Sequence, residues 1–325
     1  MKIFKSVMLG AAFAAALATG AAAADVTIKV AYENNPGEPV DVVMHHWADL
    51  VTKASDGKVE LDLYPSSQLG SKKDVIEQAM LGSNVITIAD AGFLTDYDPD
   101  MGILFGPYLG KSAADVFKIY ESDWFKSKEA ELREKGIRII IPNYLYGTRQ
   151  LLTTKPVKTP DDLKGMKIRV PDNKMQIATF EAFGATPTPM PLADVYPALS
   201  QGIVDGVENP LAVLYGQRLQ EQAKYLTMIS YMHNTSLWLG GEAYFSTLDP
   251  AVVEMLEKTG HEAGLMSQKL AAESDEKLIE QMKAAGVTVS TPDIEPFKEK
   301  AMAVYKQFPQ WTPGLYDTIK SQIGE

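Results

Sequence analysis

The sequence contains no cysteine, which excludes disulfide bonds, thiolate nucleophiles and Cys-ligated zinc or iron–sulfur sites. Histidine is scarce as well, and two of the four, His45 and His46, are adjacent. On a helix their rings would point about 100° apart and could not hold one ion together. The motifs G-x-G-x-x-G, G-x-S-x-G and H-E-x-x-H are missing, and Gly106–Ser112 has one residue too few between its glycines for a phosphate-binding loop. We therefore expect neither a metal nor a cofactor.

Basic residues are outnumbered: 31 Lys+Arg stand against 42 Asp+Glu, a formal net charge of −11. A chain this acidic is a poor partner for nucleic acid or an anionic membrane surface, so we expect neither as its main partner. The 325 residues, of which 46% are hydrophobic, are typical of a folded protein of about two domains.

Residues 1–24 have the pattern of a secretory signal peptide. Lys2 and Lys5 precede an apolar run from Val7 to Leu17, and Ala21–Ala24 supplies small residues for cleavage. An N-terminal membrane anchor is the alternative, which the short apolar run disfavours. Removing two lysines leaves 29 basic and 42 acidic residues, so the mature chain carries 29 − 42 = −13. Export without disulfides favours a periplasmic location.

The remaining chain alternates between predicted strands and helices, which indicates an α/β fold with a largely parallel sheet. In the first part, strands are predicted at 26–32, 59–64, 85–89 and 137–141, and helices at 39–54, 73–81 and 113–135. In a second α/β unit, strands are predicted at 166–170 and 203–207, and helices at 172–183 and 195–200.

One predicted helix is too long for either unit. Apolar residues recur at helical spacing from Asp249 to about Gly286, which at ~1.5 Å per residue gives roughly 50 Å. A helix of this length can lie across two lobes. The alternative is two helices separated at Gly260 or Gly264.

Polar residues recur where predicted strands end. Glu33 and Asn34 follow the first strand, Asp90 ends the strand at 85–89, and Asn209 follows the strand at 203–207. Small molecules bind α/β proteins in the crevice beyond the carboxyl ends of strands. Each residue alone is typical of a turn or a helix cap, but the recurrence of polar residues at several strand ends favours a shared binding site.

Two arginines suit an anionic ligand. Arg169 alternates with apolar residues in a predicted strand, the pattern of an ordinary exposed strand face, and Arg149 lies between two apolar runs. A guanidinium can bind a carboxylate through two parallel hydrogen bonds.

Several motifs then decide between these possibilities. The segments Tyr64–Gly70, Tyr146–Gln150, Leu163–Pro171, Gly184–Met190 and Gly202–Leu211 resemble those of solute receptors of tripartite ATP-independent periplasmic (TRAP) transporters, the DctP family. The resemblance covers essentially the whole mature chain. It implies a two-lobed periplasmic binding protein fold with hinge-crossing strands and a long helix spanning both lobes. Lobe I would hold residues 25–146 plus about 235–274, and lobe II residues 147–234 plus about 275–325.

The resemblance also implies roles for individual residues. Arg169 matches the arginine that forms the main salt bridge with the ligand carboxylate, Arg149 a second contact, and Asn209 an asparagine that hydrogen-bonds the same carboxylate. Leu192 falls where some members place an aromatic ring. The remaining residues of the expected binding set come from other segments: Glu33, Asn34, Asp90 and Asn234.

The ligand implied is a small organic acid anion that a closed receptor delivers to the small and large membrane subunits of the transporter. Acidic residues such as Glu33 and Asp90 accept hydrogen bonds from hydroxyl groups, which favours a sugar acid such as a hexuronate or aldonate. A four-carbon dicarboxylate and a sialic acid remain alternatives. A secreted enzyme using Glu33 and Asp90 as a carboxylate pair on acidic sugars is the competing class, whereas the resemblance implies no enzyme.

Overall fold

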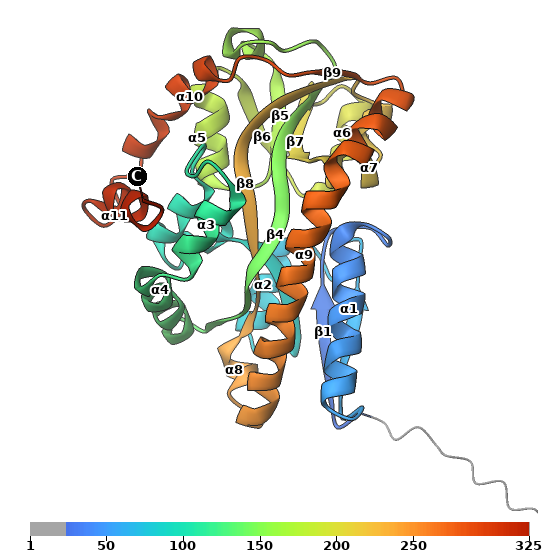
Figure 1. Ribbon diagram of the computed structural model, residues 1–325, viewed down its shortest axis with the longest axis vertical. Coiled ribbons are helices and arrows are strands. Elements are labelled where there is room, and N and C mark those ends of the chain that lie inside the picture. The colour runs from blue at the N-terminus through green and yellow to red at the C-terminus, as the bar shows by residue number, and fades with distance from the viewer. Residues whose placement is uncertain (1–23, 325) are drawn as a thin grey trace, which may run out of the picture.

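The computed structural model of the protein describes residues 24–324, so the predicted signal peptide lies outside them except for Ala24. Strands and helices alternate along this part of the chain (Figure 1). The strands are β1 (Val26–Ala31), β2 (Val59–Tyr64), β3 (Val85–Asp90), β4 (Ile137–Thr153), β5 (Lys167–Val170), β6 (Thr186–Pro189), β7 (Gly206–Pro210), β8 (Tyr225–Gly241) and β9 (Thr288–Ser290). The helices are α1 (Pro39–Ala54), α2 (Lys72–Met80), α3 (Ala113–Tyr120), α4 (Asp123–Glu134), α5 (Lys174–Ala182), α6 (Val195–Ser200), α7 (Leu211–Gly216), α8 (Glu242–Phe245), α9 (Pro250–Ala284), α10 (Glu295–Ala301) and α11 (Leu315–Gln322).

All these strands belong to one sheet, with the order β2-β1-β3-β8-β4-β7-β5-β6 and β9 beside β8. At one end β1 is parallel to β2 and β3, and at the other end β5 is parallel to β6 and β7. Between them β8 and β4 are antiparallel to each other. Strand β8 is also antiparallel to β3, and β4 to β7, whereas β9 is parallel to β8. The expectation of a largely parallel sheet is therefore correct for the two ends and wrong for the middle.

The strands β4 and β8 run the length of the sheet, 17 residues each (Figure 1). The strand predicted at 137–141 therefore continues much further than the sequence indicates. Its register with β8 shifts near Gly147, where φ is +133° and a Cβ would lie 2.8 Å from the Cβ of Pro210. A glycine at this point lets β4 pass close to the end of β7.

Hydrophobic clusters cover both faces of the sheet. Ile139 and Leu239, which pair across β4 and β8, belong to one cluster, whereas the next pair, Ile141 and Trp238, belongs to the other. Leu239 and Trp238 are neighbours and point to opposite faces. Ile139 and Ile141 are two positions apart, and the register shift between them brings them to different clusters, so both strands contribute to both clusters.

Helix α9 is continuous over 35 residues, as the apolar spacing predicts, and the alternative of two helices is wrong. A Cβ at Gly260 would lie 2.7 Å from Ile141 Cγ1, and one at Gly264 would lie 2.2 Å from Asn143 Oδ1. The two glycines thus allow the helix to approach β4 closely instead of interrupting it. The single helix predicted at 113–135, by contrast, is two helices, because the Ser122 side chain accepts from Phe125 N (3.3 Å) and gives α4 its own N-cap.

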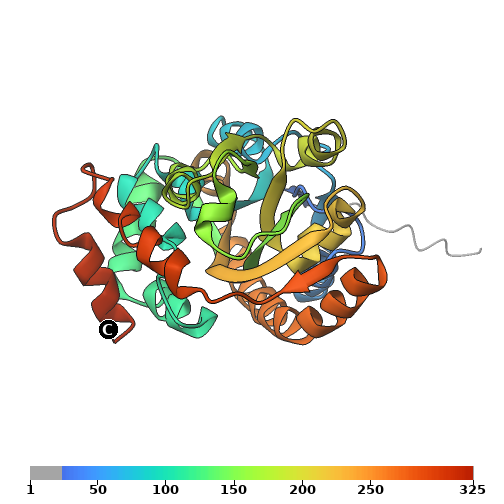
Figure 2. The same ribbon diagram turned by 90° about the horizontal axis from the view of Figure 1, so that it is seen from above.

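The C-terminal segment packs back onto residues 99–109. Trp311 Nε1 donates to Pro99 O (2.9 Å), and Thr312 donates to Asp100 through N (2.8 Å) and Oγ1 (2.7 Å). Figure 2 shows the C-terminal helices beside α3 and α4. Residues assigned to lobe II by the sequence thus contact residues assigned to lobe I, and the lobe boundaries stay a prediction. Within residues 24–324, none of the helices combines the length and apolar character needed to cross a membrane.

Candidate functional site

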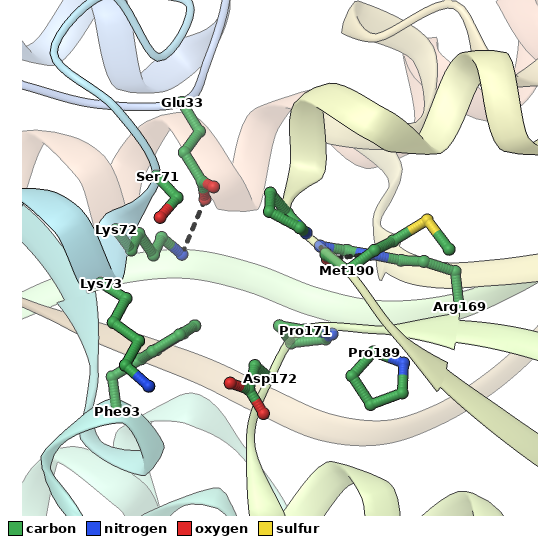
Figure 3. Close-up of a pocket in the computed structure, with 11 residues that line it drawn as sticks. Glu33, Ser71, Lys72, Lys73, Phe93, Arg169, Pro171, Asp172, Pro189 and Met190 are labelled. Carbon is green, nitrogen blue, oxygen red and sulfur yellow. Dashed lines mark hydrogen bonds and ion pairs between the residues drawn. The ribbon is translucent and has the colours of Figure 1, made fainter.

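A cavity of about 310 Å³ lies between the segments that follow β1, β3 and β5. Its size fits the lower end of the range for small-molecule sites. Figure 3 shows the side chains from the first 93 residues on one side and those from residues 169–191 on the other. The lining residues are Glu33, Ser71, Lys72, Lys73, Phe93, Arg169, Pro171, Asp172, Pro189, Met190 and Pro191.

Arg169, on β5, is one of two buried cations in this cavity, with 3% of its surface exposed. Its Nε and Nη2 donate to Met190 O at 3.0 and 2.6 Å. Burial lowers the pKa of the guanidinium from its ordinary value. The prediction of an exposed strand face is therefore wrong at Arg169, which is buried and hydrogen-bonded to Met190, in the segment after β6.

Lys72, in the first turn of α2, is the second buried cation and was not predicted. Its Nζ lies 3.0 Å from Asp90 Oδ2 and 3.5 Å from Glu33 Oε2, and 5.6 Å from the centre of the Phe93 ring. A signal was present in the sequence. Ser71 and Asp74 form a capping box that fixes the start of α2 at Lys72, and a cation there opposes the helix dipole. A lysine at this position therefore needs a partner elsewhere in the fold to offset its unfavourable interaction with the helix dipole.

Asp90 connects Lys72 to a buried polar network beneath the cavity. Its Oδ1 accepts from Ser236 Oγ (2.7 Å) and Asn234 Nδ2 (3.3 Å), and Asn234 Oδ1 accepts from Arg149 Nη1 (2.5 Å). Burial acts to raise the pKa of Asp90, but Lys72 and Arg149 outweigh it and hold that pKa below the usual value. Asp90 is therefore a carboxylate, although it is buried.

Arg149 is itself paired with Glu208, which is fully buried. Nε of Arg149 donates to Glu208 Oε2, and Nη2 donates to Oε1 at 2.8 Å. Glu208 also accepts from Tyr231 OH (2.6 Å) and Gln176 Nε2 (3.0 Å). Burial acts to lower the pKa of Arg149, but Glu208 and neighbouring groups raise it above its ordinary value. Glu208 is not among the residues predicted from the sequence, although it stands next to Asn209.

The other predicted residues lie around this network. Asn209 is inside β7, not after it, because the strand begins at Gly206; its buried Oδ1 has no donor among residues 24–324. Asn34 donates to Glu38 Oε2 (2.7 Å) and to Tyr146 OH (3.2 Å). Burial is the main cause that raises the pKa of Glu38 to about 7. Leu192 is buried in a hydrophobic cluster and does not line the cavity.

The structure thus places the predicted residues in two groups. Glu33 and Arg169 line the cavity, while Asp90, Arg149 and Asn234 form the network beneath it. Within the described part of the chain, histidine, aspartate and glutamate form no group of three that could hold a metal ion.

Comparison with known proteins identifies the family. Residues 30–310 match the family described as bacterial extracellular solute-binding protein, family 7, also named DctP. The chain belongs to this family. Sialic acid-binding periplasmic protein SiaP of Vibrio cholerae is 30% identical to this family 7 protein, over 80% of the present chain and 81% of SiaP.

Two solved structures resemble this family 7 protein closely. A TRAP periplasmic solute-binding protein from Ochrobacterium anthropi with bound L-fuconate is 60% identical, with a TM-score of 0.91, and the match covers 93% of the present chain and 100% of that one. One from Actinobacillus succinogenes with bound L-galactonate is 42% identical, with a TM-score of 0.90 and coverages of 91% and 99%. The resemblance to TRAP solute receptors and the two-lobed periplasmic binding protein fold are confirmed. The family consists of extracytoplasmic receptors and is not an enzyme family.

Proposed function

We propose that this receptor binds a six-carbon sugar acid of the aldonate type in the periplasm, without converting it, and delivers it to the membrane subunits of a TRAP transporter. The observation that carries the proposal is one small cavity with the buried Arg169 on one side and the polar side chains of Glu33 and Lys72 on the other. The bound ligands of the two solved relatives support it. L-Fuconate is 6-deoxy-L-galactonate, so the two ligands share every carbon centre except the terminal one.

Arg169 is the proposed carboxylate contact. Its two hydrogen bonds go to a neutral carbonyl, that of Met190, so its positive charge has no carboxylate directly bound to it among residues 24–324. The family resemblance implies supporting contacts from Arg149, Asn209 and Asn34, which are not among the residues that line the cavity. Along the sugar chain, Glu33 offers acceptors for hydroxyl groups, and the cavity's apolar surface comes from Phe93 and the residues around Met190.

A ligand panel tests the proposal by thermal shift. L-Fuconate and L-galactonate are expected to raise the unfolding temperature by several degrees, because a ligand at 1,000 times its Kd stabilises the native state by about 4 kcal/mol. Succinate, malate and N-acetylneuraminate are expected to have little effect. Stabilisation by succinate or malate with none by sugar acids would overturn the proposal, and slow consumption of a glycoside during prolonged incubation would favour an enzyme.

Ligand binding is proposed to close the two lobes, residues 25–146 plus about 235–274 and residues 147–234 plus about 275–325. Three of the contacts between residues of the two proposed lobes are relevant to this closure. Lys174 Nζ lies 2.7 Å from Asp96 Oδ1, Gln217 Nε2 donates to Glu38 Oε1 at 2.9 Å, and Gly92 packs against Asn173. A ligand that touches both lobes shifts the population toward the state that contains these contacts.

A single methyl group at Gly92 tests this closure. A Cβ there would lie 1.7 Å from Asn173 Nδ2 and 2.3 Å from its Cγ, and Asn173 is held because its Oδ1 accepts from Met175 N (3.0 Å). We expect Gly92→Ala to weaken L-fuconate binding at least tenfold in calorimetry while the ligand-free protein keeps its unfolding temperature. The double variant Gly92→Ala/Asn173→Ser, which keeps a helix-capping residue, is expected to recover affinity. Unchanged affinity in the single variant would contradict closure at this contact.

A further inference from the structure

The two buried cations of the cavity differ in how their charges are compensated. Lys72 Nζ is paired with both Asp90 (3.0 Å) and Glu33 (3.5 Å), and the side chains of these carboxylates are 2% and 10% exposed. Arg169, by contrast, donates to the carbonyl of Met190. The buried groups of the cavity thus present one cation without a directly bound carboxylate.

The compensated cation lies at the far end from the arginine. Figure 3 shows the Glu33–Lys72 pair on the opposite side of the cavity from Arg169. A linear ligand with its carboxylate on Arg169 therefore places its other terminus near this pair. A hydroxyl group or a methyl group can be accommodated there, whereas a second carboxylate meets the negative charge of Glu33 before it can use Lys72.

We propose that Glu33 restricts this receptor to monocarboxylates, by neutralising Lys72 and repelling a second carboxylate on the ligand. This inference rests on the proposed function and names the group that selects within the sugar acids. Without the Glu33 charge, Lys72 would retain Asp90 as its structural partner and could also pair with a terminal carboxylate. Because Asp90 holds the lysine from the buried side, the lysine needs no new position for this second role.

One pair of ligands isolates the effect of a second carboxylate on binding. L-Galactonate and galactarate share the same carbon chain and hydroxyl configuration and differ at carbon 6, where galactarate has a second carboxylate. We expect the native protein to bind L-galactonate at least a hundredfold more tightly than galactarate in calorimetry. In Glu33→Gln, which keeps the size and the acceptor oxygen, we expect this ratio to fall at least tenfold through a gain in galactarate affinity.

Three further variants test whether the discrimination depends on the negative charge of Glu33 itself and on Lys72. Asp172→Asn removes a charge of the same sign from an exposed residue of the same cavity, and it is expected to leave the ratio within about threefold of the native value. Glu33→Asp keeps the charge and is expected to keep the discrimination. Glu33→Gln/Lys72→Met removes the unmasked cation and is expected to abolish the gain for galactarate.

The outcomes also distinguish this inference from the proposed function. A native protein that binds neither L-galactonate nor L-fuconate overturns the proposed function itself. Strong L-galactonate binding with an unchanged ratio in Glu33→Gln, or an equal change in Asp172→Asn, overturns the role of Glu33 alone. A native protein that binds galactarate as tightly as L-galactonate overturns it as well. A gain in Glu33→Gln that depends on Lys72 confirms it.

Discussion

Replacing Arg169 with methionine is expected to weaken binding of L-fuconate or L-galactonate more than a hundredfold. Charge-assisted hydrogen bonds contribute roughly 1.5–3 kcal/mol each, and the substitution removes two of them if the guanidinium binds the carboxylate through both. Methionine retains an apolar stem of similar length, so the packing of β5 is preserved. Because Arg169 donates only to the carbonyl of Met190 in the hydrogen bonds described above, no buried carboxylate loses its partner.

The matched control for this change is Lys167→Met. Lys167 lies two residues earlier on β5, on the same face, but it is exposed. It carries the same charge and is expected to leave affinity unchanged. Calorimetric titration of both variants, with the unfolding temperature as a check on the fold, decides the matter. An Arg169→Met protein that binds within tenfold of the native one removes Arg169 from the carboxylate site.

Glu208→Gln is expected to lower the free energy of unfolding by about 3–5 kcal/mol. The expected effect is on stability and not on ligand selectivity. The substitution leaves Arg149 charged, buried and without its carboxylate. It also brings an amide group toward Tyr231 and Gln176, which both donate to Glu208 in the native protein. Two donors then face each other in a buried space, which adds to the loss. Denaturant-induced unfolding of the ligand-free protein measures the change.

Glu242 offers a closely matched control for this prediction. It accepts two hydrogen bonds from the guanidinium of Arg138, at 2.7 and 2.9 Å, but its side chain is 24% exposed. Water can therefore solvate the charge that Glu242→Gln leaves behind, and we expect a loss of about 1 kcal/mol or less. Equal losses in the two variants would mean that burial of the Arg149–Glu208 pair does not determine its contribution.

The elements that the sequence predicts well have strong local patterns. The predicted bounds of 39–54 and 59–64 coincide with those of α1 and β2, because one apolar stripe or a short alternation marks each of them. The strand β8 was not predicted. It is buried along nearly its whole length and carries Asn234 and Ser236 among its apolar residues, so its polar positions serve the buried network and do not mark a solvent-facing side. Such a strand has no alternation to detect.

The residues of the candidate site likewise divide into those that local patterns or motifs predict and those that they do not. Glu33 and Asp90 were predicted because strand ends can be located from local apolar runs, and Arg169 and Arg149 from the family motifs. The pairings could not be predicted, because Lys72 is 18 residues from Asp90 and Arg149 is 59 residues from Glu208. Whether a charge is neutralised depends on such long-range pairs, and they form only in the folded chain.

The place of β8 in the sheet determines when the protein can fold. This strand lies between β3 and β4, so the strands formed by the first 153 residues cannot complete their pairing until residue 241 is available. The contacts of Trp311 and Thr312 with residues 99–100 span 212 positions. Topologies dominated by such distant contacts fold slowly. A newly made chain therefore cannot complete its native sheet until most of it has been synthesised.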